Sequence, residues 1–479
     1  MSDLAPFSAT TKPLVYLERD WNSLCDHGLE KTADYIIRVN GIYYEAIKGG
    51  TSTGAGTIAY GGENNAGTVD GTNAYAVAQA TLDTPGVKHV HFGTGTFTLV
   101  TKLSPPTNMK ISGNGYGTKI VTTGNIECFD IDNKSNVIIE NIYFYGSDNT
   151  GVNTSNSLRI QGGDNVHVRN CYMENCYMGV RLDGGNNHTI SDNKIYDVWI
   201  GVHIDSHGVY GEPTDIIINN NHILTTGEDG IFVDATGLTD GNVIVTNNMI
   251  KDTNDYGIDL TDADHVIVDG NVVDGTALYS GIVLGTANSR NCVISNNISK
   301  NCAADGIQAT AGSNYNTITG NYCYNNGDCG IDMYSTTTPL SYNIVTGNIC
   351  RDNASTGLRA RETEYSVYTN NVAEGNAVLE MQFILNLGNI VDNNIGHRTR
   401  NCGKVTMLNG TQAIAVGAHG LPGVPTAIHV TGSSVDTEDV YVNGYDATNI
   451  SWINAVGVVA GDRVIFWSAE YNVNVASPT

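Results

Sequence analysis

A short pattern repeats along the middle of this chain and strongly restricts its fold. An apolar, β-branched run ends in Asn, and successive Asn residues of this kind are 23 to 29 positions apart. They are Asn141, Asn170, Asn193, Asn221, Asn248, Asn271, Asn297, Asn321, Asn348 and Asn371. A fixed period of about 20–50 residues is typical of stacked supersecondary units. Because each unit holds short strands without helical periodicity, we expect a β-solenoid whose Asn side chains hydrogen-bond in a stack at a sharp corner.

A glycine followed by an alternating strand recurs between these Asn corners. The glycines are Gly179, Gly201, Gly230, Gly257, Gly281, Gly306, Gly330 and Gly357. The first and third positions after each glycine are apolar, as in Ile231 and Val233. Since side chains alternate between the two faces of a strand, these positions point into the coil and the second and fourth point outward. The outward residues of successive coils should therefore share one sheet surface.

The balance of charges narrows the range of partners. The chain carries 49 acidic and 24 basic residues, a formal net charge of −25. Nucleic acids and anionic membranes bind basic patches, so this charge argues against both. An anionic substrate would need a cation such as Ca²⁺ or a local basic cleft, although no loop has a recognisable calcium-binding spacing. The N-terminus lacks the basic start and apolar segment of a signal peptide, and no apolar run reaches the roughly 18 residues of a membrane helix.

The ten Cys residues do not show the paired spacing of zinc knuckles. Cys323 and Cys350 each follow a repeat Asn by two positions. We expect them to stack as thiols inside the solenoid, with a disulfide as the alternative. The cysteine count therefore leaves the redox compartment open.

The repeat divides the chain into four segments. Residues 1–60 are expected to be an irregular attachment or capping segment, and residues 61–108 a cap helix with the first strands. Residues 109–402 contain the coils. Residues 403–479 contain short strands and predict a small β-sandwich, either a carbohydrate-binding or assembly module or a cap over the open end of the solenoid.

Two local signals stand out before the coils begin. Asn40-Gly41 lies between two β-rich runs and predicts a hairpin. Further on, Asp70 or Thr72 is expected to cap a short helix whose apolar face includes Val77.

Outward positions on four successive coils gather charged and aromatic side chains. They are Arg181, Asp183, His203, Asp205, Asp229, Asp234, Tyr256 and Asp259. Coils stack about 4.8 Å apart, so these residues should lie within a small area. Like charges repel, and a column of carboxylates on a sheet is therefore unfavourable unless it has a purpose. The interleaved Arg and His favour a functional site over a solvated polar face. The long turn at residues 206–214 would place His207 and Tyr210 beside it.

One chemistry that fits these residues is removal of the C5 proton of a uronate sugar. That reaction needs a base, an acid and a group that neutralises the substrate carboxylate. His203 or His207 would be the base, Tyr256 the proton donor and Arg181 the neutralising group.

The other chemistry is hydrolysis of a glycosidic bond by paired carboxylates. Asp205, Asp234 and Asp259 are the candidates for the acid and for the nucleophile or base. Asp183, Asp229 and Tyr210 complete the expected substrate-binding surface.

The start of the coils resembles a known fold family. An Asp, a short helix, Phe-x-x-Gly-Thr-Phe at 92–97 and Gly-x-Gly-x-x-Thr at 113–118 follow one another. This order resembles the start of pectate-lyase-like right-handed parallel β-helices, including many phage tailspikes. The resemblance implies an all-β, right-handed parallel β-helix solenoid whose N-terminal cap helix plugs one end.

The coils around Asp205 also resemble mannuronan C5-epimerases and related alginate lyases. Their Asp-Pro-His motif reads Asp-Ser-His at 205–207, and their next-coil Asp-Gly-x-x-x-Asp motif is present at 229–234. The motif Tyr is replaced by Val202. The resemblance implies catalytic roles for Asp205 and His207, with Arg181 in place of the family Lys.

We therefore expect an enzyme acting on an extracellular polysaccharide, a polyuronate such as alginate, as a C5-epimerase or lyase. The alternatives are a tailspike-type glycan hydrolase of a virus and a non-catalytic glycan-binding adhesin. An extracellular or virion-associated protein without an organic cofactor is expected, with Ca²⁺ as the metal to test. A trimer is one expected oligomeric state, since tailspikes adopt it.

Overall fold

The computed structural model describes most of residues 33–470. Undescribed within this range are residues 49–56, 148, 151–155, 207–208, 235–240, 286–288, 311, 337, 385–387 and 397–399, and in the C-terminal region 408–414, 419–426, 433–439, 446–448 and 455–462. The chain forms a parallel β-solenoid of about 12 turns. It divides into two compact units, residues 1–181 with 187–198 and residues 182–186 with 199–479.

The first unit begins with the predicted hairpin. β1 (Tyr35–Asn40) pairs antiparallel with β2 (Tyr43–Lys48), and the turn between them contains Gly41 at φ +64°. β3 (Thr57–Gly61) continues this antiparallel sheet, while β1 also pairs in parallel with β4 (His89–Phe92). The hairpin thus extends the same sheet that the first coil begins.

The predicted cap helix is present as α2 (Ala74–Leu82), but its N-cap is neither Asp70 nor Thr72. Asn73 is the N-cap, and its side chain accepts a hydrogen bond from the N–H of Ala76 at 3.2 Å. Asp70 instead accepts two hydrogen bonds from Thr72 within the preceding turn. The N-cap lies one residue after Thr72 and three after Asp70, because the preceding turn already uses the side chains of these two residues. Among the described residues, no helix is long and apolar enough to span a membrane.

The remaining strands of the first unit are short and mostly parallel. They are β5 (Gly95–Leu99), β6 (Lys110–Thr122), β7 (Phe129–Asp132), β8 (Val137–Tyr145), β9 (Leu158–Gln161), β10 (Val166–Arg169), β11 (Tyr172–Glu174), β12 (Met178–Asp183), β13 (Thr189–Ser191) and β14 (Lys194–Val198). β7, β9 and β12 are neighbours in one parallel sheet.

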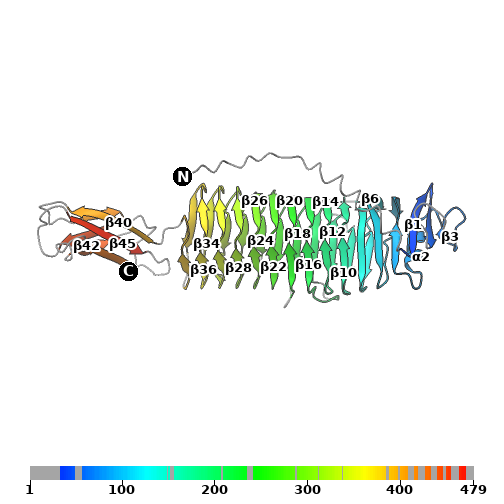
Figure 1. Ribbon diagram of the computed structural model, residues 1–479, viewed down its shortest axis with the longest axis horizontal. Coiled ribbons are helices and arrows are strands. Elements are labelled where there is room, and N and C mark those ends of the chain that lie inside the picture. Colours follow the sequence, from blue (N-terminus) through cyan, green and yellow to red (C-terminus); the bar gives the residue numbers. More distant parts are fainter. Residues whose placement is uncertain are drawn as a thin grey trace. The chain divides into compact units, whose positions relative to one another are not determined.

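In the second unit, each coil contributes one strand to each of three walls (Figure 1). The first wall contains β15 (Ile200–Asp205), β18 (Ile231–Asp234), β21 (Ile258–Thr261), β24 (Ile282–Gly285), β27 (Ile307–Ala309), β30 (Ile331–Tyr334), β34 (Thr356–Arg361) and β38 (Leu379–Ile384). We call this wall the site sheet.

The other two walls of the second unit meet at the Asn corner. One contains β16 (Ile216–Asn219), β19 (Val243–Thr246), β22 (Val266–Asp269), β25 (Val293–Ser295), β28 (Thr317–Thr319), β32 (Ile344–Thr346), β36 (Val367–Thr369) and β39 (Ile390–Asp392). The other contains β17 (His222–Thr226), β20 (Met249–Thr253), β23 (Val272–Thr276), β26 (Ile298–Cys302), β29 (Tyr322–Tyr324), β33 (Ile349–Arg351) and β37 (Val372–Glu374). The short β31 (Leu340–Ser341) and β35 (Thr363–Glu364) pair at another corner.

The C-terminal region forms two antiparallel three-stranded sheets. One consists of β40 (Arg400–Met407), β45 (Arg463–Glu470) and β42 (Ala427–Gly432), and the other of β41 (Ala415–Ala418), β44 (Asn449–Asn454) and β43 (Val440–Tyr445). The short strands expected in this region are therefore present.

The predicted Asn ladder is present, with a shift in its first members. In the second unit the buried ladder is Asn221, Asn248, Asn271, Asn297, Asn321, Asn348, Asn371 and Asn394. Asn141 and Asn170 instead lie at the neighbouring corner position with φ of +58° and +53°. Cys171 takes the ladder position there, and its N–H donates to Asn193 Oδ1 at 2.9 Å. The left-handed corner and the inward position both favour Asn, so sequence spacing alone does not separate them.

The interior of the solenoid follows the predicted alternation. The inward side chains Val202, Ile204, Ile231 and Val233 have 0% exposure. Cys323 and Cys350 are paired across β29 and β33 as buried free thiols, as expected, and none of the eight described cysteine side chains forms a disulfide.

Candidate functional site

The outward side chains of the site sheet are in the predicted register. At the second position after each glycine, the residues are paired from coil to coil in the order His203, Phe232, Asp259, Val283, Gln308, Asp332 and Arg359. Two residues further along each strand, Asp205 pairs with Asp234, and Asp234 pairs with Thr261. The sheet therefore gathers the predicted carboxylates on neighbouring strands.

His203 is less accessible than its outward position suggested. Its ring stacks on Phe232 with centroids 4.8 Å apart and an interplanar angle of 5°. The side chain is only 8% exposed. Two residues further along the same two strands are Asp205 and Asp234, both of which are half-buried.

Asp229 is the most buried of the clustered acids whose pKa is shifted. It lies directly before β18, and its Oδ1 accepts the N–H of Tyr256 at 2.9 Å. The side chain is 3% exposed. Burial, together with the nearby charge of Asp259, raises the pKa of Asp229 to about 8. This carboxyl group is therefore largely protonated at neutral pH.

Asp259 lies at the centre of the cluster, on β21. Burial raises its pKa to about 7, and the charges of Asp234 and Glu228 act in the same direction. Thr261 Oγ1 donates to Asp259 Oδ1 at 3.1 Å and partly offsets this shift. A carboxyl group with a pKa near neutrality can both donate and accept a proton under physiological conditions.

Tyr256 lies beside these acids and forms an aromatic pair. Its ring stacks on that of Tyr279, with centroids 5.0 Å apart. Burial and the adjacent Asp259 and Asp229 raise the pKa of Tyr256 to about 12. The phenol is thus protonated at neutral pH and is available as a donor.

Glu228 is a member of the cluster that the outward-position rule missed. It lies before the coil glycine, where the chain turns into the sheet, and accepts a hydrogen bond from Trp199 Nε1 at 2.6 Å. Burial raises its pKa. Its adjacency to Asp229 was the signal that would have found it.

The remaining predicted residues lie on β12 and in the long turn. Arg181 is half-buried on β12, and Asp183 has 0% exposure. Tyr210 is half-buried in the turn. The backbone of the turn packs closely against Gly184, since a Cβ atom at Gly184 would lie 2.6 Å from the Tyr210 carbonyl oxygen. The turn therefore covers the chain next to Asp183. The predicted base His207 lies outside the described residues.

A second acidic cluster occurs further along the site sheet. Asp305 repeats the arrangement of Asp229: it precedes the coil glycine, and its Oδ1 accepts the N–H of Cys329 at 2.9 Å. Burial and the nearby Asp332 raise the pKa of Asp305 to about 7. Arg359 donates from Nε and Nη2 to the two carboxylate oxygens of Asp332, at 2.8 and 2.6 Å.

The same cluster contains the set of metal-ligating atoms found in the described part of the chain. Asp305, Asp328 and Cys329 offer ligand atoms within 4.8 Å of one another. Arg359 Nη2 already donates to Asp328 Oδ2 at 3.3 Å. Ca²⁺ prefers oxygen ligands, so a group that includes a buried thiol and is partly neutralised by Arg359 does not fit the expected calcium site.

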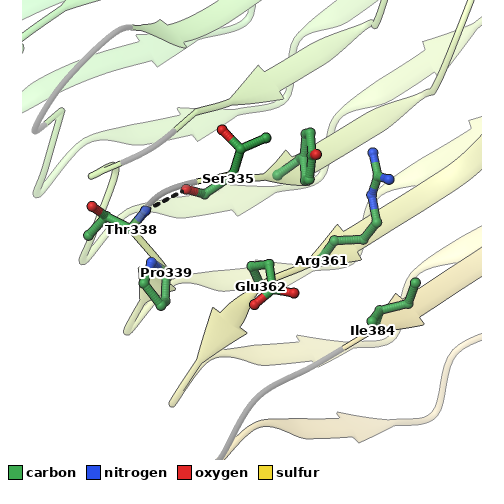
Figure 2. Close-up of a pocket in the computed structure, with 8 residues that line it drawn as sticks. Ser335, Thr338, Pro339, Arg361, Glu362 and Ile384 are labelled. Carbon is green, nitrogen blue, oxygen red and sulfur yellow. Dashed lines mark hydrogen bonds between the residues drawn. The ribbon is translucent and has the colours of Figure 1, made fainter.

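A pocket of about 520 Å³ opens at the end of β30, β34 and β38. Its lining consists of Tyr334, Ser335, Thr336, Thr338, Pro339, Arg361, Glu362 and Ile384 (Figure 2). Arg361 pairs in register with Tyr334 on one side and Ile384 on the other. Its guanidinium Cζ lies 3.8 Å from the centroid of the Tyr334 ring.

Two family models match the sequence. Residues 107–273 match the model described as right handed beta helix region. Residues 238–382 match the NosD model, described as periplasmic copper-binding protein. A comparison with curated proteins finds no significant match.

Solved structures with this fold include phage and bacterial proteins. The tailspike protein gp49 of Pseudomonas phage LKA1 has a TM-score of 0.58 at 12% identity, covering 83% of this chain and 92% of that chain. A tailspike variant of Escherichia coli bacteriophage HK620, in complex with a pentasaccharide, has a TM-score of 0.53 at 13% identity, covering 84% and 90%. The A-module of mannuronan C-5 epimerase AlgE4 of Azotobacter vinelandii has a TM-score of 0.47 at 14% identity, covering 67% and 93%.

At these identities the structural likeness shows the fold. The parallel pairing of successive coils, the repeat of one strand per wall and the family match agree with one another. The chain has the right-handed parallel β-helix fold.

Proposed function

We propose that this protein is a polysaccharide-active enzyme that hydrolyses glycosidic bonds with the carboxyl groups of the site sheet. The observation that carries the proposal is the grouping of one buried and one half-buried acid, both of raised pKa, with a further half-buried carboxylate. Asp229 and Asp259 have pKa values raised to about 8 and about 7. Asp234 lies beside them on β18 and is half-buried. One acid and one base on the same face are what glycoside hydrolysis needs.

In this mechanism Asp259 is the general acid and Asp234 the general base. Asp259 gives its proton to the glycosidic oxygen as the bond between that oxygen and the anomeric carbon breaks. Asp234 takes a proton from the water whose oxygen bonds to the anomeric carbon. Asp229, protonated and held by the Tyr256 N–H, adds no negative charge beside Asp259, whose raised pKa comes from burial and from the charges of Asp234 and Glu228.

The strand geometry fits a water molecule between the two carboxyl groups. Asp234 pairs with Thr261, two residues beyond Asp259 on the next strand. From a strand spacing of about 4.8 Å and a rise of about 3.3 Å per residue, the Cα atoms of Asp234 and Asp259 are roughly 8 Å apart. We propose that the two carboxyl groups keep about this separation, which is within the range of about 6.5–9.5 Å that accompanies inversion at the anomeric carbon.

A second candidate is proton abstraction at C5 of a uronate, by an epimerase or lyase. Tyr256 favours it, because a phenol with a pKa of about 12 lies next to Asp259 and can donate a proton. Asp205 and His207 would supply the basic side, as the resemblance to mannuronan C5-epimerases implies, and Ca²⁺ would screen the polyuronate. His203 is less suited to this role because its ring is packed against Phe232.

The partner implied by either reaction is an extracellular glycan, and the protein would act outside the cell or on a virion. Support comes from the fold shared with tailspike proteins, one of which is seen with a bound pentasaccharide.

The test is incubation with a panel of neutral and acidic polysaccharides, followed by assays for new reducing ends, for unsaturated products and for epimerised residues by proton NMR. We expect reducing ends with inverted anomeric configuration. Asp259→Asn should lower the rate by roughly 10³-fold, because the general acid is lost. Asp252→Asn, the same change at an exposed corner, is the matched control.

Formation of unsaturated or epimerised products that increases with calcium and is lost in Tyr256→Phe would support C5 proton abstraction and contradict hydrolysis. An unchanged rate in Asp259→Asn would contradict the assignment of the acid.

A further inference from the structure

The pocket at the end of β30, β34 and β38 contains an arginine that the fold itself does not use. On the same strand, Arg359 is neutralised by Asp332, whereas no carboxylate lies within ion-pair distance of Arg361 among the described residues. Arg361 Nε is buried and has no hydrogen-bond partner within the described chain. A buried donor without a partner costs free energy that the fold does not recover. A ligand acceptor would bind the Nη groups of the guanidinium, because Nε itself is not exposed.

Arg361 is also held in a fixed orientation. Its guanidinium stacks on Tyr334, and Ile384 pairs with it from the next coil. Figure 2 shows the side chain extending from β34, with Glu362 between Arg361 and Pro339. A guanidinium stacked in this way keeps its edge free for two parallel hydrogen bonds to a carboxylate.

The rest of the lining suits a sugar ring. Thr338 N–H donates to Ser335 Oγ at 3.1 Å, which closes the loop after β30 and places hydroxyl-bearing side chains along the pocket. Glu362 is exposed next to Arg361 and offers an acceptor for sugar hydroxyls. The pocket thus combines one cation, a hydroxyl acceptor and apolar side chains.

The pocket and the carboxylate cluster lie on the same wall. β21 and β34 are separated by β24, β27 and β30, so four strand spacings lead from Asp259 to the strand of Arg361. At about 4.8 Å per spacing this is about 19 Å, the span of several sugar units. In the outward column that leads to Arg361, Thr261 is paired with Gly285 and Tyr334 is paired with Arg361.

We infer that the pocket around Arg361 is a distal subsite that binds the carboxylate of an acidic sugar unit in the polysaccharide. The inference deepens the proposed function, because it assumes that the ligand is a glycan and assigns that glycan to the acidic class. On a chain with a net charge of −25, an unpaired arginine in a pocket is the feature that selects for a negative group.

The test is direct binding, measured by calorimetry in the Asp259→Asn background so that no turnover interferes. The probes are oligosaccharides of galacturonate, mannuronate and guluronate, with maltooligosaccharides and dextran oligosaccharides as neutral counterparts. We expect Arg361→Ala to weaken binding of at least one uronate probe by about 10- to 100-fold, since a charged pair of hydrogen bonds is lost. Binding of the neutral probes should not change.

Two further variants make the result specific. Arg351→Ala removes the same charge from β33, on another wall, and should leave binding unaltered. Arg361→Lys keeps the charge without the planar fork and should give an intermediate affinity. If the alanine variant does not fold, the affinity of Arg361→Lys for the uronate probes tests the inference instead.

Equal affinity of the parent and both Arg361 variants for the uronates would overturn the inference, and so would the absence of binding by all three uronate probes. Uronate binding that depends on Arg361, without cleavage by the wild-type protein, would sustain the subsite and refute hydrolysis. Cleavage by the wild-type protein together with uronate binding that does not depend on Arg361 would support hydrolysis and refute the subsite. In an active enzyme, Arg361→Ala should raise KM and leave kcat unchanged.

Discussion

The Asn ladder and the acids of the site sheet both place polar side chains in the solenoid wall, coil after coil. In the ladder, Asn271 N–H and Nδ2 both donate to Asn297 Oδ1, at 2.9 and 3.0 Å. Asn297 repeats the pattern toward Asn321, and its Nδ2 also donates to the carbonyl oxygen of Val268. Asp229 and Asp305 instead accept one backbone N–H each, and burial raises the pKa of both.

The difference follows from hydrogen-bonding capacity. An amide carries donors and acceptors, so a stack of amides satisfies itself without net charge. A carboxylate only accepts, and neighbouring carboxylates repel, so the acids stay protonated or need an arginine. Buried acids that recur on a sheet therefore add nothing to the fold that Asn would not supply better. Their presence points to chemistry or binding, whereas the ladder is explained by stability.

The largest effect is expected from breaking the ladder at Asn297→Ala. The substitution leaves the N–H of Asn271, one Nδ2 hydrogen of Asn271 and the carbonyl of Val268 without their partner at residue 297, whereas Asn321 Oδ1 keeps the backbone N–H of that residue. At about 1–3 kcal/mol for each unsatisfied buried group, we expect a loss of roughly 5 kcal/mol in the free energy of unfolding. Chemical denaturation measures it, and Asn296→Ala, at the exposed corner beside it, is the control. A loss equal to that of the control would refute the ladder's role.

A smaller loss is expected from Arg359→Met on the site sheet. Asp332 is 1% exposed and would lose both hydrogen bonds from the guanidinium. An uncompensated buried charge costs roughly 3 kcal/mol or more, so thermal unfolding should occur at a clearly lower temperature. The double variant Arg359→Met with Asp332→Leu should recover most of the loss. If the single variant is as stable as the parent, the pair does not compensate the buried charge.

The smallest effect in mildly acidic solution is expected from Asp229→Asn, and it should grow as the pH rises toward 8. The folded pKa of about 8 exceeds the ordinary value of 3.8, so the folded state holds a proton that the unfolded state releases. The contribution of this proton to wild-type stability is thus fully present below about pH 4 and is lost as the pH rises through 8. The variant lacks this loss, since its amide stays neutral and can still accept the Tyr256 N–H.

Denaturation of both proteins at several pH values between 5 and 9 measures this difference, with exposed Asp252→Asn as the control. Parallel curves for the wild type and Asp229→Asn would show that Asp229 does not titrate as described.

Much of the fold was readable from the sequence, because a period of two within strands and a fixed spacing between coils leave few arrangements. The register of His203, Phe232 and Asp259 across neighbouring strands is an example. The N-cap at Asn73 was missed, since several capping residues are adjacent there and the turn geometry decides among them. The positions of Asn141 and Asn170 were shifted, because Asn suits both the corner and the ladder.

The candidate site was readable only in part. The outward alternation predicted that Asp234 and Asp259 lie close together. The burial of the Asp229 side chain depends instead on the conformation of the turn before β18. The Arg361 pocket depends on the loop after β30, which hydrophobic periodicity does not describe. Arg359 and Arg361 are two residues apart on β34, and only the paired Asp332 distinguishes the neutralised arginine from the available one.

The regular stacking of coils has a consequence for how such a protein would measure its ligand. Along the solenoid axis, the distance between two features of the site sheet is a whole number of coil spacings, so the separation of the carboxylate cluster from the Arg361 pocket changes only in steps of about 4.8 Å. Loss or duplication of one coil would shift one feature against the other by a single step and leave every strand in register. The preferred length of the bound glycan chain would therefore change in discrete steps, each set by one coil of the solenoid.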